Sequence, residues 1–142
     1  MIETPQAFEL AIEVAAADID QNGHVNNVTY LRWVQDVAAA HWKTAAPSAA
    51  QAKLAWVVLR HEIDYKHPAF LGDSVVARTW VGAASRIKFE RHTELLRAAD
   101  RSLLAKARTL WCPIDMQTGK PAVVSPEVRA RFSAASGTDD RP

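Results

Sequence analysis

The sequence predicts an α+β fold in which a curled antiparallel sheet of about five strands surrounds one long central helix. One strand-like segment precedes a single long helical pattern, and four strand-like segments follow it. The turns between these later segments are short, which favours antiparallel neighbours. The helix is apolar over most of its circumference, so we expect the sheet to wrap around it. A length of 142 residues without an internal repeat indicates one domain.

The first two expected elements are a strand and the long helix. Residues 8–14 alternate between apolar and acidic side chains, as a half-buried strand does. After a polar turn at residues 18–24, Asn26 or Asn27 is a good N-cap for a helix that we expect to run to about Lys43. One narrow stripe of this helix is left for solvent, and it consists of Arg32, Asp36, Ala39 and Lys43.

The rest of the chain is predicted to form the other strands and a short final helix. β-branched and aromatic residues indicate strands at 54–66, 74–81, 86–96 and 103–114. On the third of these, Ile87, Phe89, Arg91 and Thr93 alternate with Lys88, Glu90 and His92. Residues 44–51 are predicted to be a loop, and Ser125-Pro126 is expected to open the short helix. We expect the domain to span residues 1–132 and the small, polar residues 133–142 to form a flexible tail.

Charge and composition exclude several classes of function. The 17 Lys and Arg residues nearly balance the 16 Asp and Glu residues, which is unlike a nucleic-acid-binding protein. No apolar run approaches the roughly 18 residues of a membrane span, and the N-terminus lacks the features of a signal peptide. The single cysteine, Cys112, is expected to be a small buried side chain. These features predict a cytoplasmic protein without a nucleic-acid or membrane partner.

The polar turn before the helix concentrates the reactive side chains. Seven residues hold Asp18, Asp20, Asn22, Gly23 and His24. A helix N-terminus offers unpaired backbone N–H groups and a positive dipole end, which suit a carbonyl oxygen that becomes an oxyanion. The candidate donors here are the amides of Val25, Asn26 and Asn27. A neighbouring carboxylate such as that of Asp20 can attack as a nucleophile or activate water as a base.

Three other roles compete for this segment. The spacing of Asp18, Asp20 and Asn22 matches the start of a calcium-binding loop, but Thr29 stands where that loop needs a Glu. Asp20 and His24 could bind a metal, but the other histidines show no tight metal-ligand spacing. The segment could also be a helix cap without chemistry, because Asp, Asn and Gly favour turns for local reasons.

The segment resembles the signature of a known enzyme family. The 4-hydroxybenzoyl-CoA thioesterase-like branch of the hotdog superfamily has Asp-x-x-Gly-x-Val before a helix with a Tyr, and the matching residues are Asp20, Gly23, Val25 and Tyr30. The segment is also similar to plant acyl-carrier-protein thioesterases, whose Asp-x-Asn-x-His is matched by Asp20, Asn22 and His24. The likeness covers about residues 8 to 130 and includes Ile63-Asp64-Tyr65, Pro68-Ala69 and Leu71-Gly72-Asp73.

This resemblance implies a hotdog-fold thioesterase that acts on an acyl-CoA or acyl-carrier-protein thioester. It implies a homodimer or homotetramer with active sites at the subunit interface. It also implies no metal and no cofactor, since coenzyme A enters only as part of the substrate. In this scheme Asp20 is the nucleophile or general base, and Asn22 and His24 position the water or the carboxylate. The plant enzymes add a Glu on the strand after the helix, for which the candidates here are Asp64 and Glu62.

The remaining candidates concern substrate binding. Tyr30 and Trp33 are expected to line the acyl pocket, whereas Trp56, Trp80 and Trp111 are expected in the core. Arg86 and Lys88 follow a loop and could meet the phosphates of coenzyme A or of a carrier arm, although a solvated strand face explains them as well. Two other functions stay open: a hotdog hydratase or dehydratase acting on enoyl thioesters, and a non-catalytic acyl-thioester-binding protein.

Overall fold

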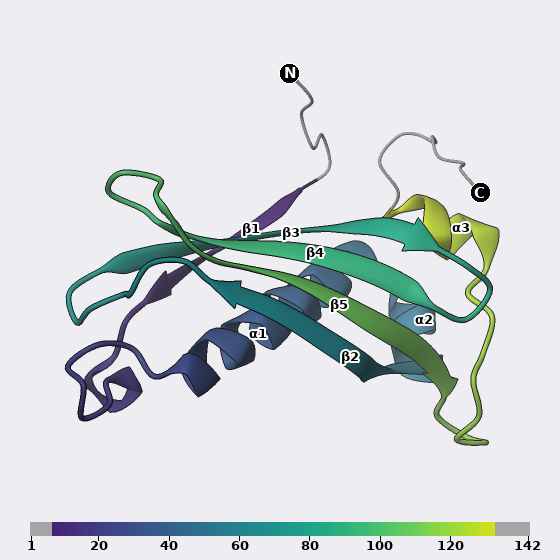
Figure 1. The fold of residues 1–142 in the computed structure, drawn as a ribbon. Helices are drawn as coiled ribbons and strands as arrows, with labels where there is room; N and C mark the ends of the chain where they lie inside the picture. The colour runs from purple at the N-terminus through teal and green to yellow at the C-terminus, as the bar shows by residue number, and fades with distance from the viewer. Residues whose placement is uncertain (1–6, 133–142) are drawn as a thin grey trace.

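The computed structural model describes residues 7–132 as one antiparallel sheet with a long helix against it (Figure 1). In chain order the elements are β1 (Phe8–Glu13), the 3-10 turn η1 (Ala16–Asp18), α1 (Asn27–Ala45), α2 (Ser48–Lys53), β2 (Leu54–Tyr65), β3 (Ser74–Ala84), β4 (Phe89–Arg97), β5 (Leu103–Asp115) and α3 (Pro126–Ala130). The predicted α+β fold with a five-stranded sheet is therefore confirmed. The predicted flexible tail at residues 133–142 lies outside the described residues.

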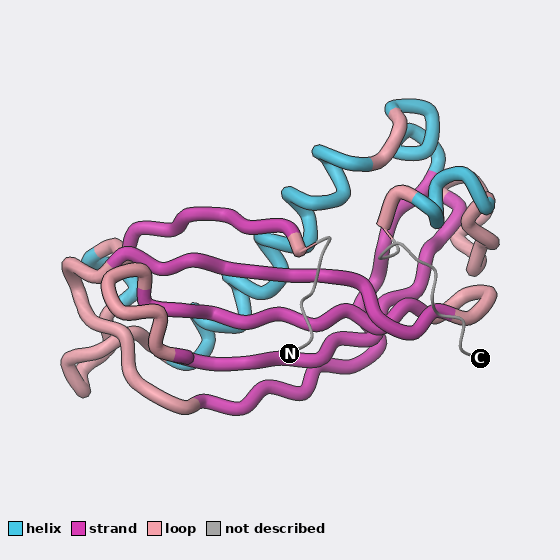
Figure 2. Tube along the Cα trace, turned by 90° about the horizontal axis from the view of Figure 1, so that it is seen from above, coloured by secondary structure: helices cyan, strands magenta, loops and turns pink. Residues whose placement is uncertain are grey.

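The strand order is β1-β3-β4-β5-β2, so β1 and β2 are the two edges of the sheet. All neighbouring strands pair antiparallel. Helix α1 crosses one face of the sheet, which curls toward it (Figures 1 and 2). The pairing of β2 with β5 shifts register between Val58 and Arg60. This bulge changes which side chains of β2 point toward α1 in the second half of the strand.

The main core lies between α1 and the middle of the sheet. Trp33, Val34 and Val37 of α1 are at most 2% exposed and pack with Val75 and Leu95. A second apolar cluster lies at the other end of α1 and consists of Ala46, Phe89, Val124, Val128 and Phe132, with several half-buried tryptophans packed against it. The main core and this second cluster are thus separate along α1.

Three details differ from the sequence-based expectation. The predicted loop at residues 44–51 contains the start of α2, because the Ala-rich segment favours helix and the Gln51 side chain donates to the Ala46 carbonyl at 2.9 Å. Strand β3 continues to Ala84 and pairs there with Phe89, so β4 begins later than predicted. Val28, which is not part of the predicted solvent stripe of the helix, is 72% exposed. Within residues 7–132 no helix is both long and apolar enough to cross a membrane.

Candidate active site

The loop between β1 and α1 is closed by backbone hydrogen bonds around Asp20. The Asp20 N–H donates to the His24 carbonyl at 3.0 Å, and the Gly23 N–H donates to the Asp20 carbonyl at 3.0 Å. Gly23 has a φ of 86°, a left-handed conformation that a side chain would strain. The motif is therefore a tight turn whose glycine is required by the backbone, and Asp20 stands at its first position.

One oxygen of the Asp20 carboxylate is engaged and the other is free among the described residues. Oδ1 accepts the Asn22 N–H at 2.8 Å, which is an Asx turn. Oδ2 has no hydrogen-bond or ionic partner within residues 7–132, and the side chain is partly exposed. The helix cap is Asn26, whose Oδ1 accepts the Val28 N–H at 2.8 Å. Asp20 is therefore held at one oxygen, and its side chain does not cap α1.

Asp18, two residues earlier, has a structural role in the same loop. It is 5% exposed, and its carboxylate accepts the Ala15 N–H at 2.9 Å. It also accepts from the Arg32 guanidinium on α1 at 3.1 Å. Asp18 thus ties the loop to the helix.

A second loop, residues 66–73 between β2 and β3, holds the Asp20 loop in place. The Val25 N–H donates to the Ala69 carbonyl at 2.8 Å. The Ala69 N–H in turn donates to the Tyr30 hydroxyl at 2.8 Å, and that hydroxyl contacts the His67 carbonyl at 3.3 Å. Burial raises the pKa of Tyr30, so its hydroxyl stays protonated at neutral pH. The Pro68-Ala69 segment thereby couples both loops to α1.

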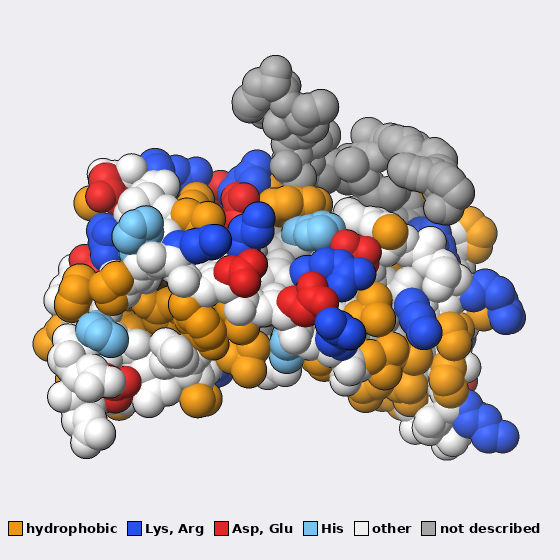
Figure 3. Space-filling model, in the orientation of Figure 1, with side chains coloured by type: hydrophobic (Ala, Val, Ile, Leu, Met, Phe, Trp, Pro, Cys, Tyr) orange, Lys and Arg blue, Asp and Glu red, His pale blue; other side chains and the backbone are white. Residues whose placement is uncertain are grey.

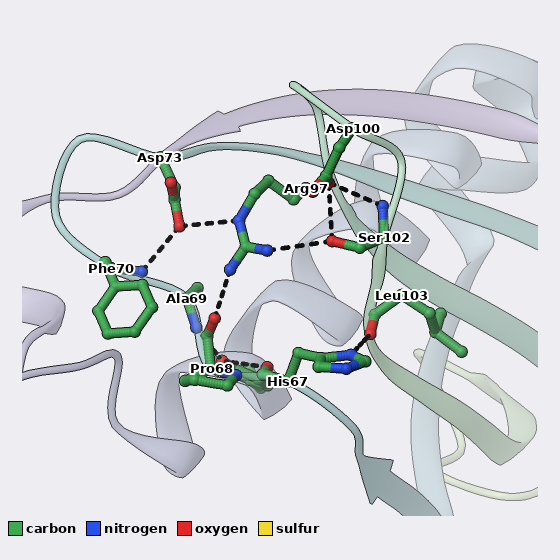
Figure 4. A network of polar contacts seen from close by, with 10 residues as sticks. His67, Pro68, Ala69, Phe70, Asp73, Arg97, Asp100, Ser102 and Leu103 are labelled. Carbon is green, nitrogen blue, oxygen red and sulfur yellow. Dashed lines mark hydrogen bonds and ion pairs between the residues drawn. The ribbon is translucent and has the colours of Figure 1, made fainter.

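Arg97 at the end of β4 braces this second loop. Figure 4 shows its guanidinium between Asp73, Pro68 and Ser102. Nε donates to Asp73 at 3.2 Å, Nη2 to the Pro68 carbonyl at 2.6 Å, and Nη1 to Ser102 at 3.0 Å. Local sequence patterns do not identify Arg97, because its partners come from two other segments of the chain.

The helix amides differ in availability, which corrects the prediction that three of them face a carbonyl oxygen. The Val25 N–H is bonded to Ala69, and the Asn26 N–H donates to the Asp18 carbonyl at 2.8 Å. The Asn27 N–H, at the first position of α1, has no acceptor among residues 7–132. Of the three predicted donors, only Asn27 is left to polarise a ligand.

The other two polar groups of the motif are close to Asp20 but not bonded to it through their side chains. His24 is half-buried, and its ring meets that of Phe70 edge to face at a centroid distance of 6.1 Å. Within the described chain its ring nitrogens have no hydrogen-bond partner. The Asn22 side chain is exposed, and only its backbone contacts Asp20.

Within one chain, Asp64 and Glu62 lie on the face of the sheet that points away from α1, so they do not lie beside Asp20. Ile63 packs against the core, and the Tyr65 hydroxyl donates to the Asn27 carbonyl at 3.2 Å, so these alternate residues of β2 face α1. Asp64 and Glu62 point to the opposite face, where they share a shallow hollow with Trp80, His92, Lys106 and Arg108. The structure therefore corrects the expectation that either carboxylate joins the site.

The predicted substrate-binding residues do not lie together in one site. Tyr30 and Trp33 are both 2% exposed, so they support the site from the core rather than line a pocket. Arg86 and Lys88 are exposed in the turn between β3 and β4. This turn lies at the end of the sheet opposite the loop that precedes α1 (Figure 1).

The main pocket lies at that opposite end, between the second half of α1 and the sheet. Its volume is about 630 Å³, and its aromatic wall consists of Trp42, Trp56, Phe89, Trp111 and Phe132. Hydrophobic side chains gather around the right-hand ends of β2 and β5 in Figure 3. Trp56 and Trp111 thus line a pocket instead of filling a core, which sequence periodicity alone does not distinguish. No residue of the Asp20 loop lines this pocket.

Comparisons with known proteins agree with this architecture. The family profile of the thioesterase-like superfamily matches residues 14–132. A 1,4-dihydroxy-2-naphthoyl-CoA thioesterase from Synechocystis superposes with a TM-score of 0.76 at 22% identity, over 88% of this chain and 94% of that one. A thioesterase from Thermus thermophilus, solved with coenzyme A and zinc, gives 0.77 at 24% identity, over 89% and 97%. No curated protein matches the sequence at a significant level.

A third similar structure is the probable thioesterase YbaW from Escherichia coli, with a TM-score of 0.74 at 23% identity over 87% of this chain and 94% of that one. These likenesses confirm the predicted hotdog fold. The family match spans most of the described residues and confirms the predicted class of thioester hydrolase. The chain belongs to the thioesterase-like superfamily.

Proposed function

We propose that the protein hydrolyses an acyl-CoA thioester, with Asp20 as its nucleophile or general base. The observation that carries this proposal is the position of Asp20. Among the described residues, one carboxylate oxygen and the nearby Asn27 amide of α1 both lack a partner, and the loop that carries Asp20 is held by hydrogen bonds. Structures solved with coenzyme A, from Thermus thermophilus and Staphylococcus aureus, share the fold and support coenzyme A as the carrier.

The proposed chemistry needs only groups of this chain and water. The Asn27 N–H and the positive end of the α1 dipole polarise the thioester carbonyl and stabilise the oxyanion. Asp20 Oδ2 either attacks the carbonyl carbon, giving an anhydride that water then cleaves, or takes a proton from the attacking water. In both routes the thiolate leaves, takes up a proton and is released with the free acid. His24, whose ring nitrogens have no partner among the described residues, is available to position the water.

The acyl group needs a pocket, but within one chain the pocket lies along the second half of α1, whereas Asp20 precedes the first residue of this helix. The helix has 19 residues, which corresponds to about 28 Å. The first residues of β2, Leu54 and Trp56, line the pocket, whereas Tyr65 at its end contacts the start of α1. A twofold axis across β2 would therefore place Asp20 of the partner subunit beside this pocket.

The exposed edge of the sheet supports such a dimer. Strand β2 is an edge strand of 12 residues, and its Val57 and Leu59 are 43% and 50% exposed. A long edge strand with apolar side chains pairs readily with a second copy. We therefore include a homodimer, which can pair again into a tetramer, in the proposed function.

Asp20→Asn tests this function. The amide retains an oxygen that accepts the Asn22 N–H, so the loop should keep its shape while the negative charge is lost. We expect kcat to fall at least about 10³-fold, which corresponds to about 4 kcal/mol of transition-state stabilisation. The measurement is thiol release from short, long, branched and aromatic acyl-CoAs. Full activity of Asp20→Asn on a confirmed substrate would refute the proposed role.

Asp18→Asn is the matched control in the same loop. Its carboxylate contacts Ala15 and the half-exposed Arg32, so its loss should lower stability by about 1 kcal/mol and change kcat by only a few-fold. Equal losses of kcat in both variants would mean that the loop was disrupted as a whole. Loss of a crotonyl double bond without free thiol would instead identify a hydratase, and saturable binding without turnover a binding protein.

A further inference from the structure

The aromatic pocket is lined by a buried arginine that has no carboxylate partner in the described part of the chain. Arg91 of β4 is 7% exposed and lines the pocket. Its Nη1 contacts His41 Nδ1 at 3.0 Å and the Thr79 hydroxyl at 3.2 Å. Within residues 7–132, neither Nε nor Nη2 has an acceptor, and no Asp or Glu pairs with this guanidinium. Arg78 on the neighbouring strand, by contrast, pairs with Glu94 at 3.4 Å.

The described residues around Arg91 do not compensate its charge. Burial lowers the pKa of Arg91 to about 10, which still leaves the guanidinium protonated at neutral pH. Burial and the neighbouring Arg91 lower the pKa of His41 to about 4, so His41 is neutral and acts as an acceptor. A buried unpaired charge is costly and persists where something other than stability requires it.

The other charged groups of the pocket lie at its rim. Asp36 is the one acidic side chain among the described lining residues; it is 54% exposed and lies 3.9 Å from Arg32. Lys43 and Arg129 add positive charge, and Arg129 stacks over the Phe89 ring at 4.8 Å. The pocket therefore combines apolar aromatic walls with a net positive charge.

We propose that this pocket binds an acyl group with an apolar body and a terminal carboxylate, and that Arg91 binds this carboxylate. This inference rests on the proposed thioester hydrolysis and names its substrate class. Nε and Nη2, which have no acceptor within residues 7–132, form the edge of a guanidinium that matches the two oxygens of a carboxylate. The aromatic walls hold the apolar body, and the volume of about 630 Å³ is typical of small-molecule sites.

Binding of non-hydrolysable analogues tests the inference independently of turnover. The probes are two thioethers of coenzyme A with eight-carbon chains, S-(7-carboxyheptyl)-CoA and S-octyl-CoA, which differ only in the terminal carboxylate. Isothermal titration calorimetry on the full-length protein should show roughly 10- to 100-fold tighter binding of the carboxylated probe, the range of a charged hydrogen bond in a buried site. Equal binding of both probes, tighter binding of S-octyl-CoA, or binding of neither overturns the inference.

Variants assign this preference to Arg91. Arg91→Met should remove the preference for the carboxylated probe and leave S-octyl-CoA binding within a few-fold, whereas Arg91→Lys should retain part of it. Arg78→Met removes an ion-paired arginine from the neighbouring strand and should leave the preference unchanged. Arg91→Met should also be at least as stable as the wild type, since it removes a buried charge that has no acidic partner in the described chain.

Two further measurements complete the test. The first asks whether Arg91 binds a ligand or a carboxylate of the partner subunit, and the second asks whether the protein hydrolyses thioesters. If Arg91→Met dissociates the oligomer, a carboxylate of the partner subunit neutralises Arg91 and the inference is wrong. The proposed function is measured separately, by thiol release from octanoyl-CoA and from its carboxylated counterpart. Thiol release without a binding preference would refute only the substrate class, whereas a binding preference without any thiol release would refute only the hydrolysis.

Discussion

His41 should make the protein lose stability in mild acid. In the native protein its pKa is lowered from 6.5 to about 4, first by burial and then by the positive charge of Arg91. Between these two values the unfolded chain binds a proton at His41 that the native protein does not. The free energy of unfolding therefore falls as the pH decreases through this range.

The size of this effect follows from the two pKa values. We expect His41 to contribute a loss of about 2 kcal/mol between about pH 7.5 and pH 5, which would approach about 3 kcal/mol below pH 4. The upper part of this range is the informative one, because carboxylates begin to titrate below about pH 5. The source of the loss is first the cost of burying a charged imidazole, and then its repulsion by the Arg91 guanidinium, whose Nη1 lies 3.0 Å from His41 Nδ1.

Urea unfolding at a series of pH values, at one protein concentration, measures the effect by linear extrapolation. His41→Gln is the control, since the amide oxygen can still accept from Arg91 but does not titrate. Burial also lowers the pKa values of His61 and His92. Both are present in wild type and variant, so the difference between the two curves isolates His41. If the two proteins lose stability equally between pH 7.5 and 5, the reasoning is wrong.

Two further predictions concern the proposed active site. His24→Ala is expected to lower kcat about 10- to 10³-fold with the fold intact, because the ring lacks a hydrogen-bond partner in the described chain; a fall in thermal stability at unchanged kcat would assign it a structural role. Light scattering is expected to give a dimer or tetramer, and Leu59→Glu in β2 should shift it toward monomers and lower kcat/KM. A monomer of 15.7 kDa with full activity would contradict the site shared between subunits.

The sequence by itself predicted the fold class and the reactive loop, because both depend on local patterns. The alternation of apolar residues in the strands, the Asn26 cap and the turn glycine at position 23 act over a few residues. The same alternation placed Arg91 on the face of β4 with Phe89 and Thr93, and the structure agrees. The loop at residues 44–51 was predicted wrongly because turn residues and a short Ala-rich helix have similar composition.

Only the tertiary structure decided which of these groups are free to act. The Val25 amide is engaged by Ala69, 44 positions away in the chain, and the Asn27 amide is left unpaired among the described residues. The faces of β2 depend on its bulge and its pairing with β5, which together turn Asp64 away from α1. Arg91 meets His41 across 50 residues and finds no carboxylate within residues 7–132. Hydrogen bonds and ion pairs form between residues that are distant in sequence. Local sequence patterns therefore identify candidate site residues but do not show which of them are left without a partner.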